Sequence, residues 1–482
     1  MAFSETQSRP PRFHISRFDR VVLGFMLVLA SLIALIIALG DQVGVTIRRA
    51  APEGIARSTS PIAIEFSELM NRESVAARFS TVPAMEGDIS WNGNTMIFYP
   101  AEPMPPGENV AVTLLRGVRS ASGRELLHDL RFDFTVRAPQ VAYLAPANSA
   151  PVNIWMADPA DPASARQITF SPSGIYDFSV SPDGSMIAFS ENNGEIGTQD
   201  IKLLNLETGG LEQLTNCVDA ACTNPVWRPD GQMIAYERVE LNSDLAAQGI
   251  SASPTRVWTL DLSRRPVETR PLFSDLQRVA HSPRWSGDGN RIAVYDTAMG
   301  AILIYDFTTG DLEAIPSRAG SSGALSPDGT KLLYPEIVLA DGALTHSYLR
   351  LVDLLNNQVI PITDPPQATD DARAEWRPDG QQIAVSRRDE SLIRGYQIYL
   401  LDPETYTAEM ITDDPRYTNM FFLWDPTGQS LAIHRFPELD ENMQPNMNGL
   451  PEIWTLNTQT GDLILISENA WMPRWVLDGI RE

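Results

Sequence analysis

The sequence is poor in the residues that mark metalloproteins, disulfide-rich scaffolds and nucleic-acid-binding proteins. It has five histidines and two cysteines in 482 residues, which excludes a zinc-rich or disulfide-dense scaffold. Lysine occurs only at Lys202 and Lys331, and the formal net charge is -24. A nucleic-acid-binding protein needs a basic face to neutralise phosphates, and this composition does not supply one.

The motifs of the common enzyme classes are also missing from the sequence. It contains no G-x-S-x-G turn, P-loop, G-x-G-x-x-G or H-E-x-x-H motif. No run has the D-x-D-x-D-G spacing of a calcium-binding loop. The histidines are scattered and show no partner pattern for a Ser-His-Asp triad: His14, His128, His281, His346 and His434. We therefore predict a protein without catalytic residues, metal or cofactor.

One long apolar run, Val21 to Gly40, is present and contains no charged residue. At about 1.5 Å per residue, a helix of this length spans a hydrocarbon core of about 30 Å. More arginines precede the run than follow it closely, so we expect residues 1–20 to be a cytoplasmic tail and residues 41–482 to lie outside the cell. The arginines before it are Arg9, Arg12, Arg17 and Arg20, and those after it are Arg48 and Arg49.

A cleaved signal peptide is the alternative to this anchor. The run ends in Ala38-Leu39-Gly40, although the apolar region of a signal peptide is usually only about 7 to 15 residues long. No cysteine stands directly after the run, so a lipoprotein anchor is excluded.

Residues 41–138 contain short runs of alternating apolar and polar residues, separated by turn signals. Ile62, Ile64 and Phe66 alternate in one run, and the turn Asn92-Gly93 separates two others. This pattern predicts an all-β sandwich. The segments SPIAIEFSELMNRESV and GDISWNGNTMIFYPAEPMPPGENVAVTL resemble the bacterial Ig-like domain of S-layer and cell-surface proteins. The resemblance implies a spacer or adhesive module without catalytic residues.

Residues 140–482 contain a repeated hairpin that has the form FSVSPDGSMIAFS, from Phe178 to Ser190. Pro-Asp-Gly or a related turn joins two apolar runs in each copy, as in a β-hairpin. The turn glycines recur about every 49 residues, the length of a four-stranded propeller blade. They are Gly184, Gly231, Gly289, Gly329, Gly380, Gly428 and Gly479.

The incomplete units at the two ends of the array complement each other. Trp475 belongs to a first strand without a second, whereas Val141 to Tyr143 match a second strand without a first. We therefore predict that the C-terminal strand completes the N-terminal sheet and closes a ring of seven blades. Six blades is the alternative, because the unit from Gly289 to Gly329 is short. The repeats resemble the TolB-type and WD-repeat-like propellers of bacterial envelopes.

Two repeated residue types have structural explanations. The aspartate recurs in the hairpin turns, from Asp183 and Asp230 to Asp478. A residue that recurs in this way is expected to stabilise the turn, so we assign these aspartates no metal-binding or acid–base role. A large apolar residue stands four positions before each turn glycine, and we expect this column to pack between blades. It comprises Val180, Trp227, Trp285, Leu325, Trp376, Trp424 and Trp475.

The connections predicted on the face opposite the short turns are longer and more variable, and binding usually occurs on such loops. They include residues 238–255, 336–346 and 435–451. We place a partner-binding surface on this face. For its aspartates we favour a solvated acidic rim, with a site for a cation or a basic protein as the alternative. Its residues are Asp370, Asp371, Asp413, Asp414, Tyr417 and Trp471, with Asp364 beside them. Cys217 and Cys222 bracket one loop there and are expected to form a disulfide outside the cell.

The sequence thus predicts an all-β protein with an N-terminal transmembrane helix at residues 21–40, an Ig-like sandwich at 41–138 and a propeller at 140–482. We expect a membrane-anchored extracytoplasmic binding or scaffold protein whose partner is a protein, peptide or glycan. An envelope assembly factor of TolB type is one alternative. A propeller hydrolase or lyase that acts on envelope polysaccharide in its central channel is another.

Overall fold

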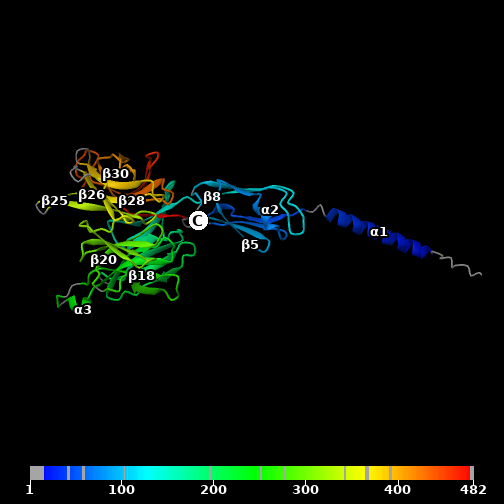
Figure 1. The fold of residues 1–482 in the computed structure, drawn as a ribbon, viewed down its shortest axis with the longest axis horizontal. Coiled ribbons are helices and arrows are strands. Elements are labelled where there is room, and N and C mark those ends of the chain that lie inside the picture. Colours follow the sequence, from blue (N-terminus) through cyan, green and yellow to red (C-terminus); the bar gives the residue numbers. More distant parts are fainter. Residues whose placement is uncertain are drawn as a thin grey trace, which may run out of the picture. The chain divides into compact units, whose positions relative to one another are not determined.

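The computed structural model describes residues 16–40, 44–56, 60–101, 104–105, 107–194, 197–246, 248–249, 252–275, 277–340, 343–363, 369–389 and 393–477. Asp364, Asp478 and Gly479 lie outside these residues. The chain forms two compact units, one of Met1–Met104 with Asn109–Thr135 and one of Pro105–Glu108 with Val136–Glu482. Each unit is described by itself below (Figure 1).

The apolar run forms a single helix, α1 (Arg17–Gly40). Ser16 caps it, because the Ser16 hydroxyl accepts a hydrogen bond from the backbone N–H of Asp19 and the Asp19 carboxylate accepts one from the N–H of Ser16. The described apolar side chains of α1 are exposed, and the helix is long and apolar enough to cross a membrane. The helix begins four residues before the predicted start at Val21.

The first unit contains two four-stranded antiparallel sheets, which confirms the predicted sandwich. Residues of alternate positions in its strands, such as Ile62, Ile64 and Phe66, are buried. A short helix, α2 (Arg72–Ala76), is capped by Asn71. One sheet contains β1 (Ile47–Ala51), β3 (Ile62–Phe66), β6 (Thr95–Pro100) and β5 (Gly87–Asn92). The other contains β2 (Gly54–Ala56), β8 (Leu130–Val136), β7 (Asn109–Leu114) and β4 (Phe79–Val82).

The described residues of the second unit form seven groups of four strands, which supports the preferred number of blades. The first group is β11 (Asp161–Gln167), β10 (Asn153–Asp158), β9 (Gln140–Ala145) and β36 (Trp471–Val476). The second is β12 (Ile175–Val180), β13 (Met186–Asn192), β14 (Gln199–Asn205) and β15 (Leu211–Gln213), and the third is β16 (Ala220–Trp227), β17 (Met233–Glu240), β18 (Arg256–Asp261) and β19 (Glu268–Pro271). A parallel bridge between Gln199 and Ala221 joins these two groups.

The remaining four groups follow in chain order as separate sheets. They are β20 (Ala280–Trp285), β21 (Arg291–Asp296), β22 (Ala301–Asp306) and β23 (Leu312–Pro316); β24 (Ala324–Leu325), β25 (Lys331–Ala340), β26 (Ala343–Asp353) and β27 (Gln358–Pro361); β28 (Thr369–Trp376), β29 (Ile383–Asp389), β30 (Ile393–Leu401) and β31 (Ala408–Met410); and β32 (Tyr417–Trp424), β33 (Ser430–Pro437), β34 (Glu452–Asn457) and β35 (Leu463–Glu468).

The two ends of the propeller unit meet in one sheet, as the incomplete repeats predict. β36 pairs antiparallel with β9, and Trp475 lies opposite Val141. Val476 and Val141 are both fully buried. The last strand thus covers the edge of β9 that would otherwise expose unpaired backbone groups.

The aspartates of the repeated hairpin are turn residues, as predicted. The Asp183 carboxylate accepts hydrogen bonds from the hydroxyl of Ser181 at 2.6 Å and from the backbone N–H of Ser185 at 3.1 Å. Gly184 has a φ of 70°, which explains why glycine follows the aspartate. Burial raises the pKa of Asp183, but its hydrogen bonds with Ser181 and Ser185 outweigh that effect and lower the pKa overall.

The apolar column packs between successive blades, and its tryptophans also form hydrogen bonds. Each indole N–H donates to a backbone carbonyl of the innermost strand in the preceding group. In each case the accepting carbonyl belongs to the residue directly before the apolar column residue of the preceding group. The pairs are Trp227 with Ser179, Trp285 with Val226, Trp376 with Ala324, Trp424 with Glu375 and Trp475 with Leu423, at 3.1–3.4 Å.

Candidate functional site

The propeller unit has two faces that differ in their connections. In several blades the residue after the third strand donates its N–H to the residue after the hairpin glycine, as Leu354 does to the carbonyl of Thr330 at 2.9 Å. The turns after the first and third strands therefore lie on the same face, which we call the turn face. The connections after the second strand and between blades emerge at the other ends of the strands, on what we call the loop face.

Three connections on the loop face are long. The connection from β17 to β18 includes a short helix, α3 (Ser243–Ala246). The connection from β33 to β34 contains an isolated bridge between Leu439 and Pro445. The third connection is not the irregular loop that we predicted for residues 336–346. β25 and β26 continue their antiparallel pairing to Ala340 and Ala343, with one register shift between Val338 and Leu339, so a hairpin extends from the sheet (Figure 1).

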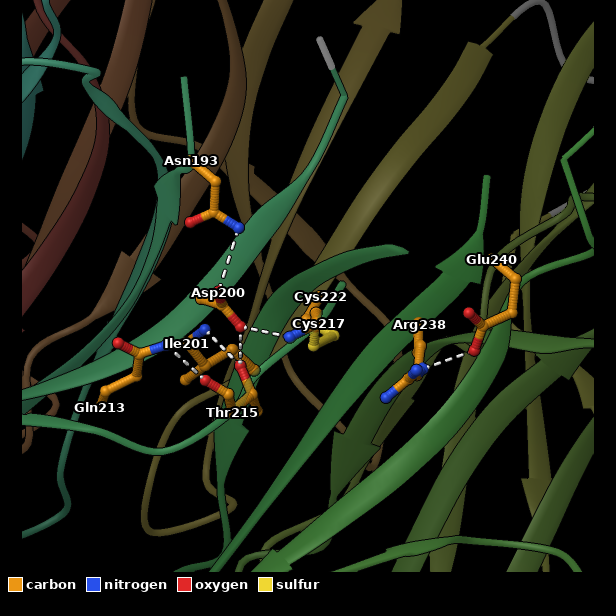
Figure 2. The surroundings of a disulfide bond; sticks show 9 residues. All are labelled: Asn193, Asp200, Ile201, Gln213, Thr215, Cys217, Cys222, Arg238 and Glu240. Atoms are coloured by element: carbon orange, nitrogen blue, oxygen red, sulfur yellow. Dashed lines mark hydrogen bonds and ion pairs between the residues drawn. A yellow bond between two sulfur atoms is a disulfide. The ribbon is translucent and has the colours of Figure 1, made fainter. Parts of the chain in front are cut away.

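Cys217 and Cys222 are joined by a disulfide, with their Cα atoms 6.3 Å apart. Figure 2 shows the buried Asp200 carboxylate beside it, which accepts hydrogen bonds from the N–H of Cys217 at 2.7 Å and from the hydroxyl of Thr215 at 2.8 Å. Both cysteine side chains are buried, and Cys222 lies within β16 rather than in the loop. Cys217 lies in the connection between the second and third groups of strands. The disulfide therefore attaches this connection to β16, the innermost strand of the third group.

Asp370 and Asp371 lie in β28 and are neutralised by arginines of β29. Asp371 is fully buried, and its carboxylate accepts two hydrogen bonds from Arg387, at 2.6 and 3.2 Å. Asp370 forms an ion pair with Arg388 at 2.8 Å and accepts a hydrogen bond from the Tyr396 hydroxyl at 2.5 Å. A solvated acidic rim is therefore the wrong description of these two aspartates.

The other predicted loop-face residues differ in exposure. Asp413 is exposed, whereas Asp414 accepts two hydrogen bonds from Arg416, which hold the pKa of the Asp414 carboxyl below its usual range. The Arg435 guanidinium lies 4.0 Å from the ring centroid of Tyr417. Trp471 packs against the core of the first blades and pairs with β9. These residues therefore do not form one continuous acidic surface.

A cavity of about 550 Å³ lies where the innermost strands of the blades converge. It is lined from all seven groups by residues such as Ser179, Val226, Ala374, Leu423 and Met472. Three arginines, Arg284, Arg373 and Arg474, also line it, and none of the described lining residues is acidic. Among the described residues of the whole chain, no group of three or more His, Cys, Asp or Glu side chains is arranged to hold a metal ion.

The sequence analysis did not identify this cavity or its arginines. A weak signal was present, because the residue just before the apolar column lines the cavity in five of the seven described groups of strands. These residues are Ser179, Val226, Arg284, Leu423 and Arg474, whereas Ala324 and Glu375 stand at the same position in the other two groups. They share no chemistry, so the repeat pattern does not draw attention to them.

Comparison with known proteins gives one family match and a set of similar solved structures. Residues 41–136 match the model of the bacterial Ig-like domain family. No curated protein matches the chain. Solved structures similar to the chain include the β-propeller domain of the Trilobed protease from Pyrococcus furiosus, with 16% identity, 75% of this chain and 93% of that chain covered, and a TM-score of 0.45.

Two further structures have the same relationship to the chain. TolB from Acinetobacter baumannii is 16% identical over 90% of this chain and 99% of its own, with a TM-score of 0.41. Oligogalacturonate lyase from Vibrio parahaemolyticus is 16% identical over 68% of this chain and 86% of its own, with a TM-score of 0.45. The chain thus combines an N-terminal apolar helix, a domain similar to the bacterial Ig-like family, and a propeller whose structural neighbours include TolB.

Proposed function

We propose that the protein is an extracytoplasmic binding protein of the bacterial cell membrane, whose propeller presents its loop face to a partner. α1 anchors the chain with its N-terminus in the cytoplasm, and residues 41–482 lie outside. The Ig-like domain acts as the spacer between membrane and propeller. The observation that carries this proposal is the asymmetry of the two faces, since the long connections occur on the loop face and the tight hairpin turns on the other.

Two features of the loop face favour binding of a macromolecule over a purely structural role. The hairpin of β25 and β26 continues strand pairing as far as Ala340 and Ala343 and includes the exposed Leu339. The connection from β33 to β34 carries Met447, which is 89% exposed. Exposed apolar side chains on rigid supports are common in protein-binding surfaces.

Site-specific photocrosslinking in living cells tests the proposal. A photoreactive phenylalanine analogue replaces Leu339 on the loop face or Leu355 on the turn face of the same blade. Both leucines are exposed, at 44% and 70% respectively, so the pair is matched in residue type and accessibility. We expect a discrete crosslinked product from position 339 and from Met447, and none from position 355.

The proposal is wrong if crosslinks form equally at both faces or only at position 355. A product that contains glycan rather than protein would change the partner class but not the face. The full-length chain is used throughout, because the anchor sets the distance of the propeller from the membrane.

A further inference from the structure

The central cavity concentrates positive charge in a protein that is strongly acidic overall. Arg284, Arg373 and Arg474 line the cavity from β20, β28 and β36. These strands are far apart in the sequence and converge only through the propeller. Charge of one sign on low-dielectric walls focuses the electric field and raises the local concentration of the opposite ion.

One carboxylate, Glu375, neutralises only part of this charge. Its Oε1 accepts a hydrogen bond from Arg284 at 2.9 Å and also pairs with Arg373. The two guanidiniums thus share a single oxygen of one carboxylate. Both nevertheless hold the pKa of Glu375 below its usual range, against the opposing effect of burial, so this group stays ionised at neutral pH.

Arg474 forms no ion pair with any of the described residues. Its Nη1 donates to the carbonyl of the adjacent Pro473 at 2.9 Å, and its guanidinium lies 5.3 Å from the Phe421 ring and 5.8 Å from the Phe178 ring. Burial and the positive charges of Arg373 and Arg284 lower the pKa of Arg474 to about 10. Arg474 therefore remains charged at pH 7, at a cost in folding free energy.

Two further polar atoms in the cavity wall have unused hydrogen-bonding capacity. Arg373 Nε and Ser179 Oγ are buried and have no hydrogen-bond partner among the described residues. Buried polar atoms are rarely left unpaired in native proteins unless a ligand or water satisfies them. Ser179 and Arg373 come from different blades, and both line the same cavity.

The nearest other carboxylates are engaged with the backbone of the inner strands. Asp177 accepts the N–H of Asn224 at 2.6 Å, and Glu237 accepts the N–H of Ser282 at 2.7 Å and the side-chain amide of Asn224 at 2.8 Å. Neither of these carboxylates lines the cavity. Asp177 and Glu237 weaken the positive potential of the arginines from a distance, but they accept no hydrogen bond from the guanidinium N–H groups.

We propose that this cavity binds a small organic anion, with Arg373 and Arg474 holding its carboxylate or phosphate group. Guanidinium groups match the oxygens of such anions through paired, charge-assisted hydrogen bonds. Phe421, Leu423 and Met472 provide apolar wall for the remainder of the ligand. The volume lies in the range of small-molecule sites, about 300 to 1,000 Å³. This site is independent of the loop-face function proposed above.

Calorimetric titration of the full-length protein in detergent micelles at low salt tests the proposal. The probes are benzoate, phenyl phosphate, inorganic phosphate and the uncharged benzamide. We expect one site per chain for benzoate or phenyl phosphate, weaker binding of inorganic phosphate, and no binding of benzamide. Binding should weaken as the salt concentration rises.

Arg474→Met tests the role of the unpaired cation, because it removes the charge and keeps an apolar side chain of comparable length. We expect at least a tenfold loss of anion affinity together with an unchanged or higher melting temperature. Arg264→Met is the control, since Arg264 is an exposed arginine outside the cavity, and it should bind the anion as the unchanged protein does. If Arg474→Met does not fold, Arg474→Gln removes the same charge with a polar side chain and provides the same comparison.

Several results would overturn the proposal. The first is equal binding of benzoate and benzamide, which would show that charge is not recognised. The second is binding of inorganic phosphate as tight as that of phenyl phosphate, which would show that the apolar wall does not recognise the organic part of the ligand. The third is unchanged affinity in the folded cavity variant, or no binding of any anion at millimolar concentration. None of these results bears on crosslinking at the loop face.

Discussion

At the scale of single residues, the arginines of this protein perform opposite tasks in similar surroundings. Arg387 neutralises the fully buried Asp371, whereas Arg474 lies among other cations without an ion-pair partner in the described residues. Breaking a buried ion pair is costly because it leaves one charge uncompensated. Removing an unpaired charge has the reverse effect, so the two arginines should respond oppositely to the same substitution.

Arg387→Met should destabilise the propeller by about 3 kcal/mol or more, because the Asp371 carboxylate would remain buried with only Thr363 as a side-chain donor. Chemical denaturation of the full-length protein in micelles measures the change. Arg416→Met is the matched control, since Arg416 forms the same two-bond contact with Asp414 at a partly exposed site. It should cost less than about 1 kcal/mol. Equal losses would contradict the role of burial.

Asp177 should make the stability of the propeller depend on pH. Burial raises the pKa of the Asp177 carboxyl to about 6, from an ordinary value of 3.8. Between these values the folded state binds more protons than the unfolded state, so this carboxyl lowers stability as the pH rises from about 4 to 6. The shift of about two pKa units corresponds to a loss of about 3 kcal/mol at pH 7.

Asp177→Asn tests this dependence, because the asparagine does not titrate and can still accept the N–H of Asn224. We expect the variant to exceed the original protein in stability by up to about 3 kcal/mol at pH 7 and by much less at pH 4. Denaturation curves at the two pH values provide the comparison. A difference that is the same at both values would show that the carboxyl does not titrate in this window.

At the scale of elements, the strand β36 is held by backbone pairing and by its side chains. It pairs with β9, buries Val476, and donates the Trp475 indole N–H to the carbonyl of Leu423. Deleting residues 471–482 should therefore destabilise the propeller by at least about 3 kcal/mol, as large core truncations do. Denaturation followed by tryptophan fluorescence measures this. Deleting only residues 478–482 is the control and should have little effect.

Within the propeller, the turns and strands that repeat could be predicted from the sequence, whereas the central cavity and the extended hairpin could not. The hairpin turn and the tryptophan column are required in nearly every blade, so the repeat itself reveals them. The cavity residues at this position vary from Val226 to Arg284 and Leu423, because each blade contributes a different side chain to one shared space. The extended hairpin of β25 and β26 was also missed, since its length is peculiar to one blade.

At the scale of the whole molecule, the helix α1 and the disulfide each allow a test of the side of the membrane on which residues 41–482 lie. If residues 41–482 are extracytoplasmic, Met447→Cys should react with a membrane-impermeant maleimide in intact spheroplasts, because this side chain is 89% exposed. Ser4→Cys in the predicted cytoplasmic tail should react only after the membrane is opened. Labelling in the reverse order would show the opposite orientation.

The disulfide provides a second, independent measurement of the same question. Disulfides persist in oxidising compartments and are rare in the cytosol. Cys217 and Cys222 should therefore resist alkylation in denatured, unreduced protein from cells and become reactive after reduction. Free thiols in the freshly isolated protein would place the propeller in the cytoplasm or show that the two sulfurs do not pair.

The pairing of β36 with β9 has a consequence for biosynthesis. β36 is made after every other described strand of the propeller, whereas β9 is made first and must wait for it. Until then β9 presents an unpaired edge, which can recruit other strands and promote aggregation. Synthesis that stops short of β36 therefore yields a chain that lacks only this one described strand but exposes the unpaired edge of β9. Such an edge can be recognised by proteases that remove defective proteins.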